Sequence, residues 1–305
     1  MENQRAIYPG QLHHSYQRSD GKVIFYSGRD CLVFFTIAMT AAKRFMVDTI
    51  GLCIMRDHIH QLTVPRDAES FIKYHSQLSS TYSREFNADC GRKGRLFADE
   101  SFGSAPKFNT KSKMAVFAYL ENNPVARHMC KNAEDYRWNF LAYAENPNPF
   151  SEKTVLRHAS TKLRNALKEV AYCQTNGLYL HYAQIDRMFN GLSPSEKEQL
   201  TDFIVSKYSR LDYKYMIDYY GTYDNMLYAF RTNSGSEYDL YEEKYFGSDA
   251  IYDKMSEVVM STGMVGKIKE IISLPDREKT RLAAIIRART GADNWHLSRF
   301  LWKAW

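Results

Sequence analysis

The sequence predicts an α+β fold in which a ferredoxin-like antiparallel sheet is followed by a mainly helical region. Strand and helix patterns alternate through residues 1–147, apolar spacing beyond residue 151 is mostly helical, and residues 275–305 show two helices around a short turn. The segment Asn146-Pro147-Asn148-Pro149 is the best linker. We therefore expect a first domain at 1–147, a helical middle region at 151–274 and a terminal unit at 275–305.

Turn residues and apolar spacing place the elements of the first domain. The expected strands are 12–17, 23–26, 49–55, 58–64 and one within 96–108, and the expected helices are 30–44, 68–86 and 110–123. Asp30 is the predicted N-cap of the first helix. Arg56-Asp57 is the predicted turn of a hairpin whose second strand ends at Pro65. Pro124 is expected to end the third helix near Asn123.

The last thirty residues are predicted to form a helix-turn-helix. A helix from Pro275 to about residue 289 is followed by the turn Thr290-Gly291-Ala292 and a second helix at 293–302. Residues 276–305 carry 7 Lys or Arg and 3 Asp or Glu, which favours contact with DNA. The candidate DNA-binding residues here are Asn294, His296 and Arg299. The alternative is an ordinary helical hairpin.

Composition limits the class of protein. The 305 residues are 44% hydrophobic and 25% charged, as in a globular protein, and no apolar run approaches the roughly 18 residues of a membrane span. Five scattered cysteines without a CxxC pair exclude a zinc ribbon and favour the reduced cytoplasm, and the first residues do not resemble a signal peptide. The net charge is +6, with both ends basic. In the loop at 91–95, Arg92, Lys93 and Arg95 are candidate DNA-backbone contacts.

His58-Ile59-His60 is the first motif that carries chemistry. Histidines at i and i+2 of a strand project from one face with Cα atoms roughly 6.5 Å apart, so both imidazoles can converge on one divalent ion. An H-x-H pattern is weak evidence in a chain with nine histidines. The alternative is a pair of surface histidines on an edge strand.

The second motif is Tyr119-Leu120-Glu121-Asn122-Asn123-Pro124. A tyrosine and an asparagine at i and i+4 share one face of a helix. If this helix packs over the histidine strand, Asn123 can supply a third metal ligand and Tyr119 can act as a nucleophile. The plain alternative is a helix C-cap followed by proline.

Longer stretches around these motifs resemble a known family. "IYPGQLHHSYQRSDGKVIF", "IGLCIMRDHIHQL", "YSREFNADCGRKGRLF", "AYLENNPVARHM" and "EDYRWNFLAY" are similar to the single-tyrosine HUH transposases, in particular the REP-associated tyrosine transposases, over residues 7–143. The ending "DREKTRLAAIIRARTGADNWHLSRFL" is similar to the helix-turn-helix of some members.

The resemblance implies a function and a site. It implies His58, His60 and Asn123 as ligands of Mg²⁺ or Mn²⁺ and Tyr119 as the nucleophile that nicks hairpin-flanked single-stranded DNA through a 5′-phosphotyrosine, in a monomer or homodimer. Two other classes remain open. One is a host-retained DNA-binding protein of the same fold without transposition activity, and the other is a metal-dependent nuclease that uses water.

Overall fold

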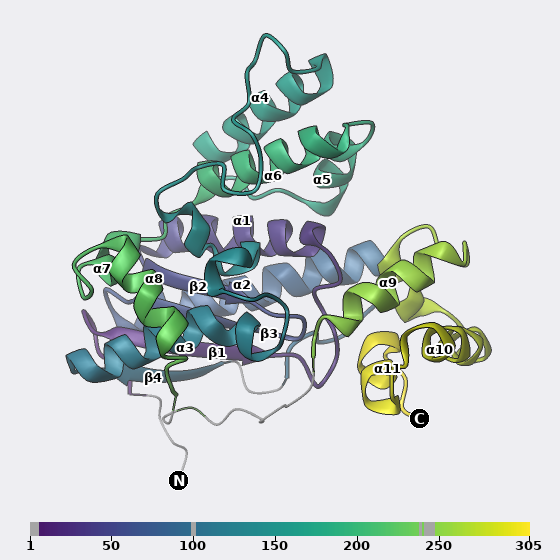
Figure 1. The fold of residues 1–305 in the computed structure, drawn as a ribbon, viewed down its shortest axis with the longest axis horizontal. Helices are drawn as coiled ribbons and strands as arrows, with labels where there is room; N and C mark the ends of the chain where they lie inside the picture. The colour runs from purple at the N-terminus through teal and green to yellow at the C-terminus, as the bar shows by residue number, and fades with distance from the viewer. Residues whose placement is uncertain (1–5, 99–101, 238–239, 241–247) are drawn as a thin grey trace.

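The computed structural model describes residues 6–98, 102–237, 240 and 248–305. Among these residues, four strands form an antiparallel sheet in the order β2-β3-β1-β4 (Figure 1). They are β1 (Leu12–Arg18), β2 (Asp48–Ile54), β3 (His58–Val64) and β4 (Gly103–Lys107). With helices α1 (Gly28–Phe45) and α2 (Ala68–Cys90) the order is β-α-β-β-α-β, as in ferredoxin-like sheets. The predicted α+β class is confirmed.

Different helices cover the two faces of the sheet. On one face lie α1 and α2, and Ile59 of β3 shares a hydrophobic cluster with Tyr74 of α2. On the other face lies α3 (Thr110–Ala126), whose Leu120 shares a second cluster with Leu62 of β3. Because side chains alternate along a strand, the even-numbered residues of β3 face α3.

Residues 23–26 do not form the strand that we predicted. Strand β1 is paired with β3 on one side and β4 on the other, so it offers no open edge to them. Their N–H groups have other partners: Val23 N donates to Arg299 O at 3.0 Å, and Ile24 N donates to Arg56 O at 2.8 Å. The segment therefore connects the C-terminal helix with the β2–β3 turn.

Helix α1 begins earlier than predicted, with Ser27 as its N-cap. Asp30, the predicted cap, lies inside the first turn. Its Oδ2 accepts hydrogen bonds from the N–H groups of Tyr26 and Ser27, both at 3.0 Å. A carboxylate in the first helical turn satisfies donors that have no partner within the helix and favours the positive end of the helix dipole.

Helix α3 starts at Thr110 as predicted but does not end before Pro124. It continues to Ala126, and Arg127 N still donates to Asn123 O at 3.1 Å. Pro124 removes only the one bond that its own N–H would have donated, to Leu120 O, and the helix continues for two residues beyond it. The prediction was wrong because it treated proline as a terminator wherever it occurs.

The rest of the chain is mainly helical and packs around the sheet domain in three groups (Figure 1). Helices α4 (Thr161–Thr175), α5 (Tyr182–Phe189) and α6 (Pro194–Tyr208) form a lobe over α1. Helices α7 (Tyr213–Ile217) and α8 (Tyr223–Thr232) contact β2 and α3, respectively. Helices α9 (Ile251–Ser261), α10 (Asp276–Thr290) and α11 (Asn294–Leu301) form the third group. Short 3-10 segments are η1 (Ala133–Asp135), η2 (Arg137–Asn139), η3 (Leu141–Ala144) and η4 (Ile268–Ser273).

The two C-terminal helices lie where the sequence predicts them, and they pack against the sheet domain. Leu297 and Phe300 belong to the same hydrophobic cluster as residues of α1 and α2. Tyr26 Oη donates to Phe300 O at 2.6 Å, and Trp302 Nε1 donates to Val23 O at 2.9 Å. The unit predicted at 275–305 therefore shares the core of the first domain, and its DNA-binding role stays a prediction.

A buried ionic network joins η4 to α1 and α2. Lys269 Nζ lies 2.9 Å from an oxygen of Asp30 and 2.6 Å from one of Asp89, and all three side chains are at most 7% exposed. Tyr182 Oη of α5 donates to Asp30 at 2.8 Å. Buried charges are tolerated when they are paired, so these contacts hold η4 against α1 and α2.

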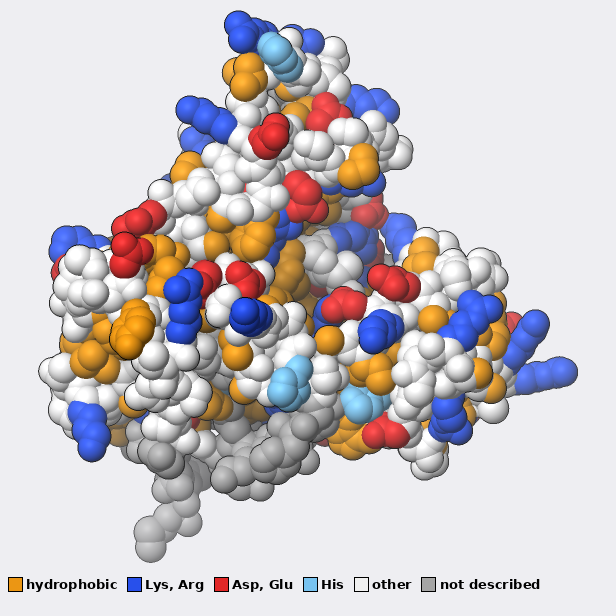
Figure 2. Space-filling view, in the orientation of Figure 1, with side chains coloured by type: hydrophobic (Ala, Val, Ile, Leu, Met, Phe, Trp, Pro, Cys, Tyr) orange, Lys and Arg blue, Asp and Glu red, His pale blue; other side chains and the backbone are white. Residues whose placement is uncertain are grey.

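The visible surface carries charges of both signs. Figure 2 shows Lys and Arg interspersed with Asp and Glu, and a hollow between the α4–α6 lobe and the α9–α11 group. In the part of the chain that the structure describes, no helix is both long and apolar enough to cross a membrane.

Candidate active site

The two motif histidines lie side by side on β3, facing α3. His58 and His60 are 2% and 0% exposed, and their ring centroids are 4.9 Å apart. Strand periodicity puts both rings on one face, as the sequence predicts. Burial lowers the pKa of His60 well below its usual value, with further lowering from His58, His14 and Arg127. His60 is therefore neutral near pH 7, which is the protonation state that binds a metal.

Tyr119 reaches this histidine pair from α3. Its ring centroid lies 5.8 Å from that of His60, in an edge-to-face arrangement. Helix α3 is fixed there by its N-cap, where Asn109 accepts from Ser112 N at 2.8 Å, and by Phe117 and Leu120 in the second hydrophobic cluster. Two motifs distant in sequence thus meet over one face of the sheet.

Asn123 lies between two residues that both reach the histidine site. Tyr119, Asn123 and Arg127 follow at intervals of four along α3 and its C-cap, so they share one side of the helix. Tyr119 contacts His60, and the charge of Arg127 lowers the pKa of His60. Asn123 Nδ2 donates to Tyr119 O at 3.4 Å, which leaves Oδ1 to serve as a possible ligand.

Strand β1 adds two site residues that the sequence analysis did not identify. His14 Nε2 and His60 Nδ1 are 3.1 Å apart, and the two rings are stacked. The Tyr16 ring centroid lies 5.1 Å from that of His60 and 5.4 Å from that of His58. Period-2 alternation places His14 and Tyr16 on one face, but only the β1–β3 register, in which Tyr16 is opposite His60, brings them to the motif.

Asp57 holds His58 in position. Its Oδ1 lies 2.6 Å from His58 Nδ1, and Oδ2 accepts a hydrogen bond from Arg299 of α11. Burial alone raises the pKa of Asp57, but the charges of His58 and Arg299 and the hydrogen bond to His58 outweigh it and hold this pKa well below its usual range. A carboxylate bonded to one ring nitrogen fixes the orientation of a histidine whose other nitrogen binds metal.

A segment from the helical region also enters the site. Glu237 is bonded to His14 Nδ1 and to Lys107 Nζ, the latter at 2.7 Å, and its side chain is 1% exposed. Burial raises its pKa, but His14 and Lys107 lower the pKa to about 2. Gly235 passes so close to α3 that a Cβ atom there would lie 2.2 Å from Tyr119 N. Its φ of +73° also favours glycine.

These residues fit a divalent ion as two imidazoles plus one amide. In His58 and His60, Nδ1 bonds a protein partner, so Nε2 is the atom that would bind metal. Within the described residues, no group of three or more His, Cys, Asp or Glu could hold a metal ion. The Asn123 amide oxygen stays the predicted third protein ligand, which would leave further positions open for phosphate oxygens.

The predicted DNA contacts other than Arg299 lie outside this site. Arg92 and Arg95 flank a cavity at the C-terminal end of α2, and Lys93 beside them is exposed. Asn294 is exposed and bonded to Arg287. His296 lies 2.7 Å from Asp293, and the Arg299 side chain, 12% exposed, is bonded to Asp57. Arg299 is thus placed beside the histidines, not on an open helix face.

Comparisons with known proteins found a distant structural similarity and no match to a family model or a curated protein. No family model matches the sequence, and no curated protein matches it. Among solved structures, the chain is similar to one described as "Structure of the REP associates tyrosine transposase bound to a REP hairpin". The identity is 16% and the TM-score 0.37, over 45% of this chain and 81% of that one. This similarity is distant and does not assign the chain to a family.

Proposed function

We propose that this chain is a metal-dependent endonuclease and strand transferase of the transposase type, acting on hairpin-flanked single-stranded DNA. The observation that carries the proposal is the meeting of Tyr119 with the His58–His60 pair, with ring centroids of Tyr119 and His60 5.8 Å apart. A phenol beside two imidazoles offers a nucleophile and metal ligands at one place.

The proposed reaction conserves the energy of the broken phosphodiester bond in a phosphotyrosine bond. Tyr119 Oη attacks the scissile phosphorus, the P–O3′ bond breaks, and a 5′-phosphotyrosine and a free 3′-hydroxyl result. The phenol gives its proton to water, and the leaving 3′-oxygen takes a proton from water, so the number of protons in solution is unchanged. A 3′-hydroxyl can then attack the phosphotyrosine and reseal a strand without ATP. A bound Mg²⁺ or Mn²⁺ would withdraw charge from the phosphate.

The test of this function is a covalent product. The protein is incubated with hairpin DNA labelled on the 3′ side of the cleavage point in Mn²⁺, and the mixture is separated under denaturing conditions. We expect a labelled protein band, because the 5′ end of the downstream strand stays on the tyrosine. Cleaved DNA with no labelled protein would favour a nuclease that uses water. DNA binding without cleavage would favour a DNA-binding protein that has no catalytic activity.

Metal affinity is expected to depend on both motif histidines. His58→Ala and His60→Ala each remove one imidazole and should weaken Mn²⁺ binding by about tenfold to a hundredfold, the range seen even for residues that only support a ligand. Isothermal titration calorimetry measures this without any DNA. His158→Ala, on the exposed surface of the α4–α6 lobe region, is the control and should bind like the wild type. Unchanged affinity in both site variants would contradict the metal assignment.

A further inference from the structure

A second cavity lies beyond the end of β1, between the loop at 91–95 and Trp302, which follows α11. Its volume is about 240 Å³, and its walls come from the β1 end, the loop at 91–95 and α11. Lys22, Arg92 and Trp302 line it together with Phe97. We call these four residues and the space between them the basic pocket. The sequence analysis named Arg92 alone among them and gave no reason to bring it to the C-terminus.

The cavity of the basic pocket carries more positive than negative charge, because Lys22, Arg92 and Arg95 line it and Asp20 is the carboxylate in its wall. Among the described residues, neither Lys22 nor Arg92 forms an ion pair. The Arg92 guanidinium instead donates hydrogen bonds to Asn87 Oδ1, at 2.6 Å, and to backbone carbonyls of the loop. Burial lowers the pKa of Arg92, and the neighbouring Cys90 offsets this only in part. An anion in the cavity would supply the missing charge.

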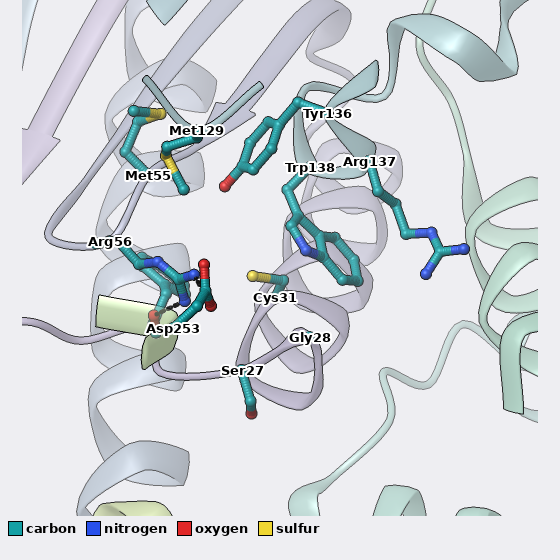
Figure 3. Close-up of a pocket in the computed structure, with 11 residues that line it drawn as sticks. Ser27, Gly28, Cys31, Met55, Arg56, Met129, Tyr136, Arg137, Trp138 and Asp253 are labelled. Carbon is teal, nitrogen blue, oxygen red and sulfur yellow. Dashed lines mark hydrogen bonds and ion pairs between the residues drawn. The ribbon is translucent and has the colours of Figure 1, made fainter. Parts of the chain in front are cut away.

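A different cavity contrasts with the basic pocket, because its arginines are paired with carboxylates. The cavity of about 290 Å³ in Figure 3 also contains two arginines, at the edge of β2. There Arg56 is paired with Asp253, and Arg137 is paired with Glu198 at 2.5 Å. Its cations are already matched by carboxylates, so it has no need of an anionic ligand.

The aromatic ring of Trp302 lies beside the cations of the basic pocket. The Trp302 ring centroid is 4.8 Å from the Arg92 guanidinium and 5.2 Å from Lys22 Nζ. Trp302 has a φ of +54°, in the left-handed region that a bulky residue rarely adopts. Phe86 stacks on this ring and Val23 O accepts from its Nε1, so the indole is held rigidly. Aromatic rings flanked by cations are the usual means of binding unpaired bases and their phosphates.

The end of β1 connects the basic pocket with the strand that carries the histidines. Arg18, the last residue of β1, is paired with His58. The next residue, Ser19, donates its N–H to Asp57 O at 2.8 Å and forms a bridge with Phe97 of the pocket wall. Two such neighbouring strand segments span roughly 10 Å. The pocket wall is therefore about this far from the histidine strand along the backbone, on the side of the sheet that α1 and α2 cover.

We infer that the basic pocket binds one unpaired nucleotide of the DNA strand next to the cleaved phosphate, with the base against Trp302 and the phosphate between Lys22 and Arg92. This inference rests on the proposed function, because it takes its direction from the histidine site. It adds a place where the single strand is held during the reaction, made from the β1 end and the C-terminal helix.

The test measures DNA binding without cleavage. Fluorescence anisotropy with labelled oligo(dT) in EDTA gives the affinity of the full chain at several salt concentrations. Lys22→Gln should weaken binding and reduce the slope of log K against log salt by about 0.7, one phosphate contact on single-stranded DNA. Trp302→Ala should weaken it by about tenfold, as expected from loss of one stacked base. Trp305→Ala, an exposed tryptophan at the end of the chain, and Lys43→Gln are the controls and should bind like the wild type.

A second readout covers the chance that Trp302→Ala disturbs the fold. Oligonucleotides with 5-iodouracil at single positions are cross-linked to the wild-type protein by light, and the attached peptide is sequenced. We expect a cross-link at Trp302 for one or two positions next to the cleaved bond. Wild-type affinity and slope in Lys22→Gln, no binding of oligo(dT) by the wild type, or cross-links elsewhere would each overturn the inference. The covalent adduct assay tests the function separately, since it can succeed or fail whichever way these binding results fall.

Discussion

Tyr119→Phe is expected to abolish the covalent protein–DNA product while DNA binding persists. The substitution removes one oxygen and keeps the ring that contacts His60. Loss of a hydrogen bond from the hydroxyl should cost on the order of 1 kcal/mol of stability at most. The adduct should fall below detection, because phenylalanine has no nucleophilic atom. The labelled-hairpin assay in Mn²⁺ measures the adduct, and anisotropy in EDTA measures binding.

The matched control for this prediction is Tyr16→Phe. Tyr16, which the sequence analysis did not identify, has its ring centroid 5.1 Å from that of His60 and 5.4 Å from that of His58. We expect the Tyr16→Phe protein to form the adduct. If Tyr16→Phe abolishes the adduct and Tyr119→Phe does not, then Tyr16 of β1 is the nucleophile and the motif on α3 positions it. If wild type forms the adduct and both single variants do too, another group is the nucleophile.

The second large effect is expected from Lys269→Met, in the buried network between η4, α1 and α2. The variant leaves the Asp30 carboxylate buried without the cation that lies 2.9 Å from it. Breaking a buried pair on one side typically costs about 3–5 kcal/mol of unfolding free energy, and urea unfolding followed by circular dichroism measures it. Adding Asp30→Asn to Lys269→Met should recover part of the loss, because the unpaired charge is then removed.

The neighbouring Lys267 supplies the control for this measurement. Its ammonium group pairs with Asp186 at 2.6 Å, but its side chain is 53% exposed. Exposed pairs contribute about 0–1 kcal/mol, so Lys267→Met should unfold almost like the wild type. Equal effects of the two substitutions would show that the Lys269 network does not hold the helical region to the sheet.

Local patterns in the sequence were sufficient to predict the elements that carry the motifs. Strand β3 runs from His58 to Val64, as alternation and Pro65 indicate, and α3 begins at Thr110. The meeting of Tyr119 with His60 followed from packing one helix over one strand. These predictions used only the periodicity of side chains and the residues that begin or end an element.

Contacts between distant segments could not be predicted in this way. His14 and Tyr16 reach the site through strand register, which pairs β1 with β3 and not with residues 23–26. Glu237 and Arg299 arrive from segments whose position depends on the packing of the whole helical region. A charged residue on a short basic helix resembles a DNA contact in sequence, and only the structure shows Arg299 bonded to Asp57.

The bond between Arg299 and Asp57 has a consequence for the order of events during synthesis. The strand with the histidines is made about 240 residues before α11, which at ~5–20 residues per second corresponds to roughly 12–48 s of translation. During that interval the growing chain has Asp57 without its arginine and the sheet without the helix that covers residues 23–26. The bond that holds Asp57 beside His58 therefore forms only after α11 has left the ribosome.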